Sequence, residues 1–216
     1  EWTLVQYATA EIGVVLVNIN PAYRTHELAY ALNQSGCRFL IAAPSYLTSN
    51  YQAMVASVQD QTPVLERTVF FWSPEWEALI AGDAQYQASV EDLRGQLNPD
   101  DPINIQYTSG TTGFPKGATL THRNILNNGY FVGELQRLTE QDRMCIPVPF
   151  YHCFGMVMGN LACTSHGATM VIPSDGFDAA RTLEAVSQER CTALYGVPTM
   201  FIAELAFEDF TKFDLS

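Results

Sequence analysis

Short apolar runs rich in β-branched residues alternate with amphipathic segments over most of this 216-residue chain, and no other feature constrains its fold as strongly. The runs have the length of buried strands, and the segments between them carry apolar residues at helical spacing. The predicted strands are 14–19, 39–42, 67–72, 103–107, 118–121, 145–148, 169–172 and 193–195. The predicted helices are 2–12, 25–34, 46–58, 90–97, 123–138, 155–164, 178–189 and 198–205. This alternation predicts an α/β fold with a mostly parallel β-sheet covered by helices.

The charge balance narrows the classes of function. Hydrophobic residues make up 47% of the chain, which excludes a disordered protein. The 23 Asp and Glu outnumber the 11 Lys and Arg and give a net charge of −12. We expect no nucleic-acid partner, because a protein neutralises phosphates with a basic surface. Charged residues make up only 16% of the chain, against about 25% in a typical soluble domain, so we expect part of the surface to be covered.

The cysteines indicate reduced thiols. Their number is odd and none form a CxxC pair, a pattern that favours mostly buried, free thiols over a disulfide framework. They are Cys37, Cys145, Cys153, Cys163 and Cys191. Cys153, Cys163 and His166 match no zinc spacing, so we predict no metal site there.

An uncharged stretch lies between Arg143 and Asp175. Proline, histidine and glycine residues interrupt it, and no apolar run approaches the roughly 18 residues that a membrane span needs. The stretch therefore predicts a buried helix followed by a buried strand, with no transmembrane segment.

The loop within residues 105–117 carries the clearest chemical signal. An apolar strand leads into a segment with three glycines, four hydroxyl side chains and Lys116. Glycines let successive backbone N–H groups face an anion, and the lysine adds a positive charge, so the segment suits a polyphosphate. A plain flexible linker would need neither the lysine nor the flanking strands. The spacing fits neither a Walker A P-loop nor the Rossmann fingerprint.

Residues 105–117 resemble the phosphate-binding signature of the AMP-forming, adenylating enzyme superfamily, which includes acyl-CoA synthetases, luciferases and peptide-synthetase adenylation domains. Residues 147–156 resemble the aromatic and histidine motif of the same family, and 13–41 and 195–199 carry weaker likeness. The likeness is strongest to medium- and long-chain fatty acyl-CoA synthetases. It implies that residues 1–216 are part of the large N-terminal, AMP-binding domain of an adenylate-forming enzyme, here incomplete, and that the C-terminal domain is absent.

The resemblance assigns roles to residues. The β- and γ-phosphates would be cradled by Thr108, Ser109, Gly110, Thr111, Thr112 and Gly113. Lys116 would steady these phosphates and the leaving pyrophosphate. His152 would lie between the acyl pocket and the adenylate, and Phe154, Gly155 and Met156 would line the acyl tunnel. The position of His152 alone favours a buried, structural role. The motif around His152 reverses that preference and favours a role in the site. A hydrolase built on Ser109 and His152 is disfavoured, because the segment is not G-x-S-x-G.

The implied function is that of a fatty acid–CoA ligase, with ATP, Mg²⁺ and coenzyme A as substrates or cofactors. Residues 147–156 contain no acidic side chain to pair a substrate ammonium, so an uncharged, apolar acid is preferred. The alternatives are a ligase for another apolar or aromatic acid and a non-catalytic nucleotide-binding module. The family's adenine-stacking, Mg²⁺-binding and ribose-binding segments are absent, so we expect the isolated chain to be inactive. The resemblance also allows a homodimer and a cytoplasmic location with peripheral membrane contact, or organelle targeting by a segment ahead of Glu1.

Overall fold

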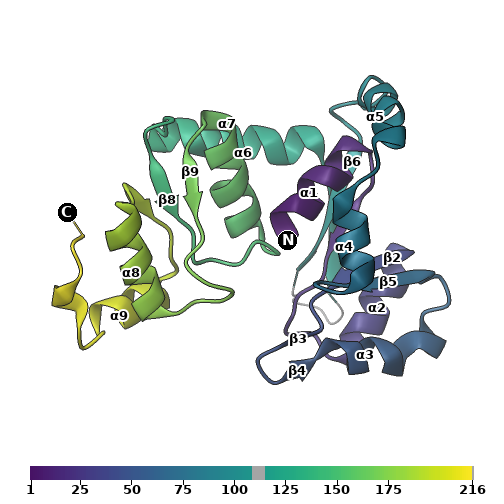
Figure 1. The fold of residues 1–216 in the computed structure, drawn as a ribbon, viewed down its shortest axis with the longest axis horizontal. Helices are drawn as coiled ribbons and strands as arrows, with labels where there is room; N and C mark the ends of the chain where they lie inside the picture. The colour runs from purple at the N-terminus through teal and green to yellow at the C-terminus, as the bar shows by residue number, and fades with distance from the viewer. Residues whose placement is uncertain (109–114, 216) are drawn as a thin grey trace. The chain divides into compact units, whose positions relative to one another are not determined.

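The computed structural model describes residues 1–108 and 115–215. The chain forms two compact units, Glu1–Thr121 and His122–Ser216, and each is considered by itself. Both units combine helices with short strands, so the predicted α/β class is confirmed (Figure 1). Among the described residues the strands form four small sheets rather than one. Four of the six strand pairs are parallel and two are antiparallel.

The first unit is built around three small sheets. Its helices are α1 (Trp2–Glu11), α2 (Thr25–Ser35), α3 (Tyr51–Val58), α4 (Pro74–Ala81) and α5 (Gln87–Arg94). Its strands are β1 (Leu16–Asn18), β2 (Phe39–Ala42), β3 (Ser45–Tyr46), β4 (Ser49–Asn50), β5 (Arg67–Phe70), β6 (Pro102–Thr108) and β7 (Lys116–Thr121). Strand β6 is central in the order β1-β6-β7, parallel to β1 and antiparallel to β7. Strands β2 and β5 pair in parallel, and β3 and β4 pair antiparallel.

Helix α2 shows how the sequence sets a boundary. Leu28 and Leu32 lie one turn apart on its buried face and pack with Leu40 and Val58. Gly36 ends the helix in the left-handed conformation, at φ 66°, which glycine adopts without a steric penalty. The predicted helix therefore forms almost as expected, although its N-cap is Arg24 and not Thr25.

The predicted helix over 46–58 is wrong at its start. The β3–β4 hairpin occupies 45–50, with Leu47 at a positive φ of 50°. The Asn50 side chain then accepts a hydrogen bond from the Ala53 N–H and caps α3. Helix α4 was not predicted at all, although Ser73 caps it and Pro74 stands at its first turn.

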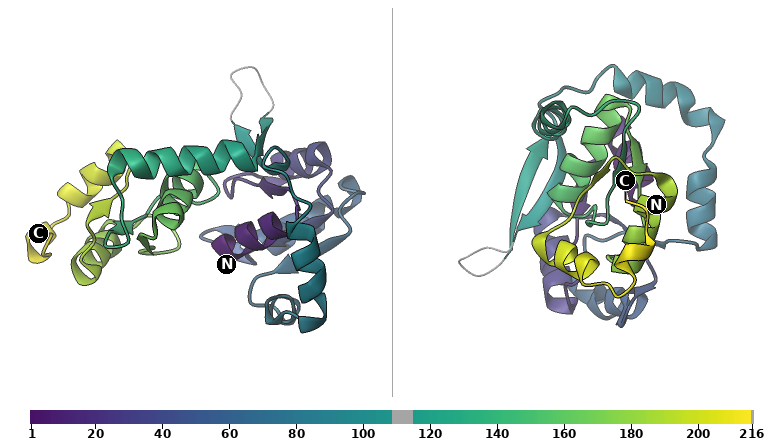
Figure 2. Two further views of the ribbon diagram at one scale, coloured as in Figure 1. Left: turned by 90° about the horizontal axis from the view of Figure 1, so that it is seen from above. Right: turned by 90° about the vertical axis from the view of Figure 1, so that its left-hand side faces the viewer.

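The second unit contains one parallel sheet in the order β10-β8-β9. The strands are β8 (Arg143–Cys145), β9 (Thr169–Val171) and β10 (Ala193–Leu194). The helices are α6 (His122–Gln136), the π-helix η3 (Phe154–Leu161), α7 (Ala162–His166), α8 (Ala179–Glu189) and α9 (Pro198–Leu205). Helix α6 is the longest of the unit's described helices (Figure 2). The predicted helix over 155–164 is thus a π-helix that continues into α7.

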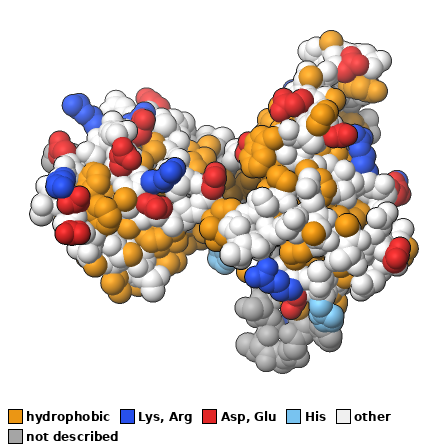
Figure 3. Space-filling model, turned by 60° about the horizontal axis from the view of Figure 1, so that its bottom comes forward, with side chains coloured by type: hydrophobic (Ala, Val, Ile, Leu, Met, Phe, Trp, Pro, Cys, Tyr) orange, Lys and Arg blue, Asp and Glu red, His pale blue; other side chains and the backbone are white. Residues whose placement is uncertain are grey.

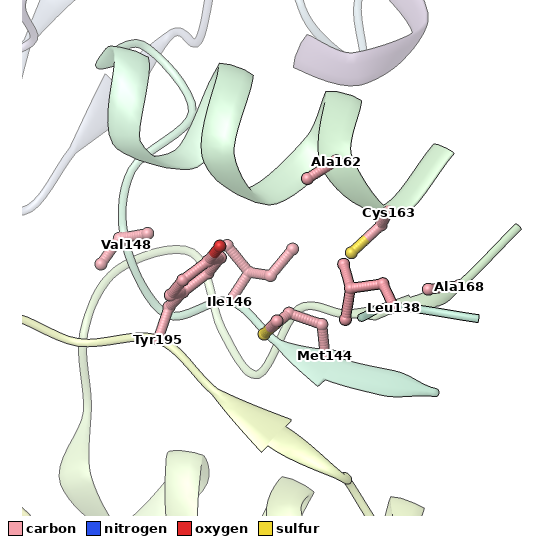
Figure 4. Close-up of a cluster of buried hydrophobic side chains, with 8 residues drawn as sticks. All are labelled: Leu138, Met144, Ile146, Val148, Ala162, Cys163, Ala168 and Tyr195. Atoms are coloured by element: carbon pink, nitrogen blue, oxygen red, sulfur yellow. The ribbon is translucent and has the colours of Figure 1, made fainter. Parts of the chain in front are cut away.

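The core of the second unit lies between β8 and the η3–α7 segment (Figure 4). Met144 and Ile146 project from β8 and the residue after it toward Ala162 and Cys163, and all four are nearly inaccessible to solvent. Buried thiols were expected, and Cys145 and Cys163 are fully buried while the other three cysteines are partly buried. All five are free.

Two glycines let α6 approach the η3–α7 segment closely. A Cβ added at Gly129 would lie 2.7 Å from the Leu161 Cβ, and one added at Gly133 would lie 2.4 Å from the His166 ring. Such distances leave no room for a side chain, so the sequence Gly-x-x-x-Gly on α6 sets how tightly these helical segments pack.

Large apolar side chains remain on the surface, as the low charge content led us to expect. Leu135, Ile202 and Leu205 are exposed by 85%, 64% and 68%. On the face drawn in Figure 3, apolar side chains occupy wide areas between the charged ones. What covers these areas stays a prediction. Over the described residues, the structure has no helix that is long and apolar enough to cross a membrane.

Candidate active site

One group of candidate residues lies at the end of the β6–β7 hairpin where residues 109–115 connect the two strands. Thr108 and Lys116 are partners in the antiparallel register, and the Thr108 hydroxyl donates a long hydrogen bond of 3.5 Å to the Lys116 carbonyl. Both residues are exposed. The remaining predicted phosphate-binding residues fall outside the described part of the chain: Ser109, Gly110, Thr111, Thr112 and Gly113. The hairpin therefore brings Thr108 and Lys116 together at the two ends of that segment.

Strand β6 is held firmly behind this end of the hairpin. The Tyr107 hydroxyl donates a hydrogen bond of 3.1 Å to the Ala31 carbonyl on α2. Asn104 and Gln106 are buried, and the Gln106 side-chain N–H donates to the Asn104 Oδ1 at 2.8 Å. Sequence reasoning did not single out these polar residues. The signal available was two amides at alternating positions in an otherwise apolar strand.

Lys116 is electrostatically unusual in this chain. It is one of only two lysines, the other being Lys212. Lys212 pairs with Asp209 at 2.7 Å, whereas the Lys116 ammonium forms no ion pair with any residue that the structure describes. An exposed ammonium that pairs with no described carboxylate is available to an anionic ligand, in a protein whose net charge is −12.

In the second unit, the candidate residues lie in the turn that leads into η3. The His152 N–H donates to the Pro149 carbonyl at 3.3 Å, and the His152 carbonyl accepts from the Met156 N–H at 3.0 Å. The ring nitrogen Nδ1 of His152 accepts a hydrogen bond of 3.1 Å from the Phe154 N–H. The ring is exposed, so the expectation of a buried histidine, drawn from position alone, is wrong. A local hydrogen bond orients the ring while leaving it open to solvent.

The predicted acyl-site residues form the start of η3. Gly155 is buried, and a Cβ there would lie 2.4 Å from the Pro149 carbonyl oxygen, so only glycine fits this position. Met156 is fully buried and Phe154 is partly buried. A π-helix is rare and often marks a functional site. His152, Phe154, Gly155 and Met156 are neighbours in the sequence, and the structure places them at the turn into η3 and in its first residues.

Tyr195, just after β10, completes the support of this segment. Its ring meets that of Phe154 edge to face, with the centroids 5.0 Å apart. Its hydroxyl donates to the Met158 carbonyl at 2.9 Å and accepts from the Gln136 side-chain N–H at 2.6 Å. Burial raises the pKa of Tyr195, so its hydroxyl stays a donor. Sequence reasoning noted residues 195–199 only as a weak likeness and missed this contact.

Thr108 and Lys116 belong to the first unit, and His152 and the start of η3 belong to the second, so each group is described as a candidate site of its own unit. Two grooves among the described residues contain no predicted site residue. One, of about 520 Å³, runs along β9 and α8, and the other, of about 440 Å³, lies between α8, β10 and α9. Over residues 1–108 and 115–215, no group of three or more His, Cys, Asp or Glu is arranged to hold a metal ion.

The family model described as AMP-binding enzyme matches residues 1–216, the whole chain. The chain belongs to the AMP-binding enzyme family. This confirms the resemblance seen in the glycine- and threonine-rich loop and in residues 147–156.

Curated relatives within the AMP-binding family are acyl-CoA synthetases and ligases by name. The putative acyl-CoA synthetase YngI of Bacillus subtilis is 45% identical over 236 residues, which cover 100% of this chain and 43% of the relative. The mitochondrial medium-chain acyl-CoA ligase ACSF2 of Danio rerio is 39% identical over 237 residues, covering 100% of this chain and 39% of the relative. The chain thus spans less than half the length of these relatives.

Solved structures with the same fold include the N-terminal domain of FACL13 from Mycobacterium tuberculosis. It matches with a TM-score of 0.79 at 23% identity, over 98% of this chain and 50% of that domain. The anthranilate CoA ligase AuaEII matches with a TM-score of 0.80 at 24% identity, over 100% of this chain and 41% of its own. These similarities confirm the predicted fold, that of the N-terminal domains of adenylate-forming enzymes.

Proposed function

We propose that the protein containing this chain is an AMP-forming fatty acid–CoA ligase. A carboxylate oxygen of the acid attacks the α-phosphorus of ATP, the bond to the β-phosphate breaks, and an acyl-adenylate and pyrophosphate result. The thiol of coenzyme A then attacks the acyl carbonyl, gives up its proton, and displaces AMP. Residues 1–216 would be part of the large AMP-binding domain of this enzyme.

The observation that carries the proposal is the placement of Lys116 beside Thr108 at the end of a tethered hairpin. The chemical difficulty of the first step is that a carboxylate must approach a polyanion. An unpaired ammonium and fixed hydrogen-bond donors offset that repulsion where negative charge builds up. Lys116 and the Thr108 hydroxyl would contribute such groups, together with the N–H groups and hydroxyls of residues 109–113.

The acid is proposed to be uncharged and apolar apart from its carboxylate. Around His152, residues 147–156 bring no carboxylate that would pair with a substrate ammonium. Phe154, Gly155 and Met156 at the start of η3 would form part of the wall of the acyl site. The curated relatives named as medium-chain acyl-CoA ligases support a fatty acid as the substrate.

Further parts of the proposal concern groups that the described residues do not bind by themselves. Mg²⁺ is proposed to be held by the phosphate oxygens of ATP together with a family segment that lies outside residues 1–216. Coenzyme A is proposed as the acyl acceptor.

We also propose that the enzyme is cytoplasmic with at most peripheral membrane contact. It is further proposed to be a homodimer, and light scattering on the purified protein tests this oligomeric state directly.

The decisive experiment is acid-dependent exchange of labelled pyrophosphate into ATP, measured on the full-length protein. We expect exchange that requires Mg²⁺ and a fatty acid such as octanoate or palmitate, and none with the corresponding alcohol. Nucleotide binding without exchange would contradict the ligase and favour the non-catalytic module. Exchange with benzoate but with no fatty acid would contradict the assigned substrate class.

A further inference from the structure

The Tyr195 hydroxyl is the middle member of a hydrogen-bond chain that joins three elements of the second unit. Gln136, the last residue of α6, donates to the Tyr195 hydroxyl at 2.6 Å. That hydroxyl donates to the carbonyl of Met158, in the middle of η3, at 2.9 Å. Because the glutamine supplies a donor, the hydroxyl proton is left for the carbonyl. Figure 4 shows the ring within the core cluster beside Ile146 and Val148.

A second contact reaches the first turn of the same π-helix. The Tyr195 ring meets the Phe154 ring at a centroid distance of 5.0 Å and an interplanar angle of 68°. Such edge-to-face pairs stabilise a defined ring orientation. Tyr195 therefore holds η3 at two points, Phe154 and Met158, that lie about one turn apart. Two points of attachment restrict both the rotation of the helix about its axis and its sliding along it.

A π-helix depends on such outside support more than an α-helix does, because its wider turn is rare as a free-standing structure. The packing around η3 leaves little space for the helix to shift. Gly155 abuts the Pro149 carbonyl, and a Cβ at Gly159 would lie 3.1 Å from the Ile146 side chain. A small shift of η3 would thus move Phe154 and Met156 together.

We propose that Tyr195, oriented by Gln136, is a positioning residue that holds η3 in its π-helical form and thereby sets which acyl-chain lengths the ligase accepts. The part that concerns acyl chains rests on the proposed function, because it takes Phe154, Gly155 and Met156 as acyl-site residues. The part that concerns the π-helix rests only on the contacts of Tyr195. Neither Tyr195 nor Gln136 would touch the substrate.

Simple core packing is the competing explanation, since Tyr195 is 9% exposed and belongs to a buried cluster. The variant Tyr195→Phe separates the two, because it keeps the ring and its packing and removes only the hydroxyl. Thr182→Val is the matched control. Thr182 is fully buried in α8, where its hydroxyl donates to the Asp178 carbonyl at 2.8 Å, and it lies outside the hydrogen-bond chain to η3.

The first test is amide hydrogen exchange measured by mass spectrometry on the full-length protein. In Tyr195→Phe we expect exchange within 154–161 to accelerate about fivefold, as for the loss of one hydrogen bond, with exchange in α8 unchanged. Thr182→Val should accelerate exchange in α8 and leave 154–161 as in the wild type. Unchanged exchange over 154–161 in Tyr195→Phe would overturn the positioning role.

The second test is the pyrophosphate exchange assay on the full-length protein with fatty acids of 6 to 16 carbons. Tyr195→Phe and Gln136→Leu should each raise the KM for the preferred acid about fivefold, leave the KM for ATP unchanged, and broaden the chain-length profile. Thr182→Val should keep the wild-type profile. If Tyr195→Phe keeps the wild-type chain-length profile while its amide hydrogen exchange over 154–161 is faster, the link to specificity is overturned. A wild type without acid-dependent activity would overturn the proposed function instead, and the first test would still decide the positioning role.

Discussion

The backbone N–H of Phe154 donates a hydrogen bond to Nδ1 of His152, with the two nitrogens 3.1 Å apart. An N–H needs a lone pair as its acceptor, so Nδ1 carries no proton in this arrangement. The proton of the neutral ring is then on Nε2. Because the ring is exposed, this Nε2–H can be offered to a ligand oxygen.

This geometry separates two roles of His152, and substitutions can remove them one at a time. The Oδ1 of His152→Asn takes the place of Nδ1 as acceptor for the Phe154 N–H, while the Nε2–H donor is lost. We expect this variant to unfold at the wild-type urea concentration and to adenylate roughly tenfold to a hundredfold more slowly. His152→Ala should lose both stability and activity. Wild-type adenylation by His152→Asn would show that the Nε2–H has no part in the reaction.

Lys116→Ala should slow pyrophosphate exchange by about a hundredfold, because the charge that offsets the polyphosphate is removed. Stability should not change, since the ammonium is exposed and has no ion pair with a described residue. Lys116→Arg should retain part of the activity, as it keeps the charge in a different shape. The chain's other lysine provides the control, and Lys212→Ala should match the wild type. Equal rates for Lys116→Ala and Lys212→Ala would argue against the phosphate role.

Gly133→Ala should destabilise the second unit by about 1–3 kcal/mol, as overpacking of a tight contact does. The new Cβ would lie 2.4 Å from the His166 ring, which cannot retreat freely because Nδ1 contacts the Ala162 carbonyl and the ring stacks on Tyr130. Urea unfolding followed by circular dichroism measures the effect.

A double-mutant cycle checks this explanation. In a His166→Ala background the penalty of Gly133→Ala should largely vanish. Gly95→Ala is the control, because its Cβ would meet only the Asp92 carbonyl at 3.6 Å. An equal penalty for Gly133→Ala with and without the His166 ring would contradict the steric argument.

Glu204 predicts a pH-dependent stability. It is 3% exposed, its Oε1 has no hydrogen-bond partner among the described residues, and burial raises the pKa of its carboxyl. The folded state therefore holds this proton more tightly than the unfolded chain. Its contribution to stability is fully present below the unfolded pKa, near 4.5, and is lost as the pH rises through the raised folded value.

Glu204→Gln should remove this dependence. At neutral pH the variant should be more stable than the wild type by about 1–3 kcal/mol, and near pH 4 the two should unfold alike. Glu208→Gln, which changes an exposed carboxylate four residues on, should follow the wild type at every pH. A constant difference between Glu204→Gln and the wild type across pH 4–8 would refute the role of ionisation.

Much of the fold follows from local sequence patterns. The apolar run 39–42 became β2, and Pro198 at a first turn marked the start of α9. The patterns failed where short-range chemistry competes with periodicity. The β3–β4 hairpin depends on Leu47 at positive φ, which leucine rarely adopts, and helical spacing cannot distinguish the π-helix from an α-helix.

The roles of the candidate site residues stay predictions, whereas their place in the fold can be compared with the sequence. The motif around Lys116 identified the hairpin end, and residues 147–156 located His152 and the start of η3. The support of η3 by Tyr195 could not be predicted, because it arises from packing between distant segments. No local pattern reports that a tyrosine hydroxyl will meet a particular carbonyl.

The hydroxyl of Tyr195 bonds to a carbonyl 37 residues earlier in the chain and to an amide 59 residues earlier. During synthesis, the η3 segment is made before Tyr195 and β10 are added to the chain. Contacts of such sequence separation form late, because loop closure must precede them. The part of the nascent chain with the most unusual helical geometry therefore waits for a partner, and its final turn geometry belongs to the last stage of folding.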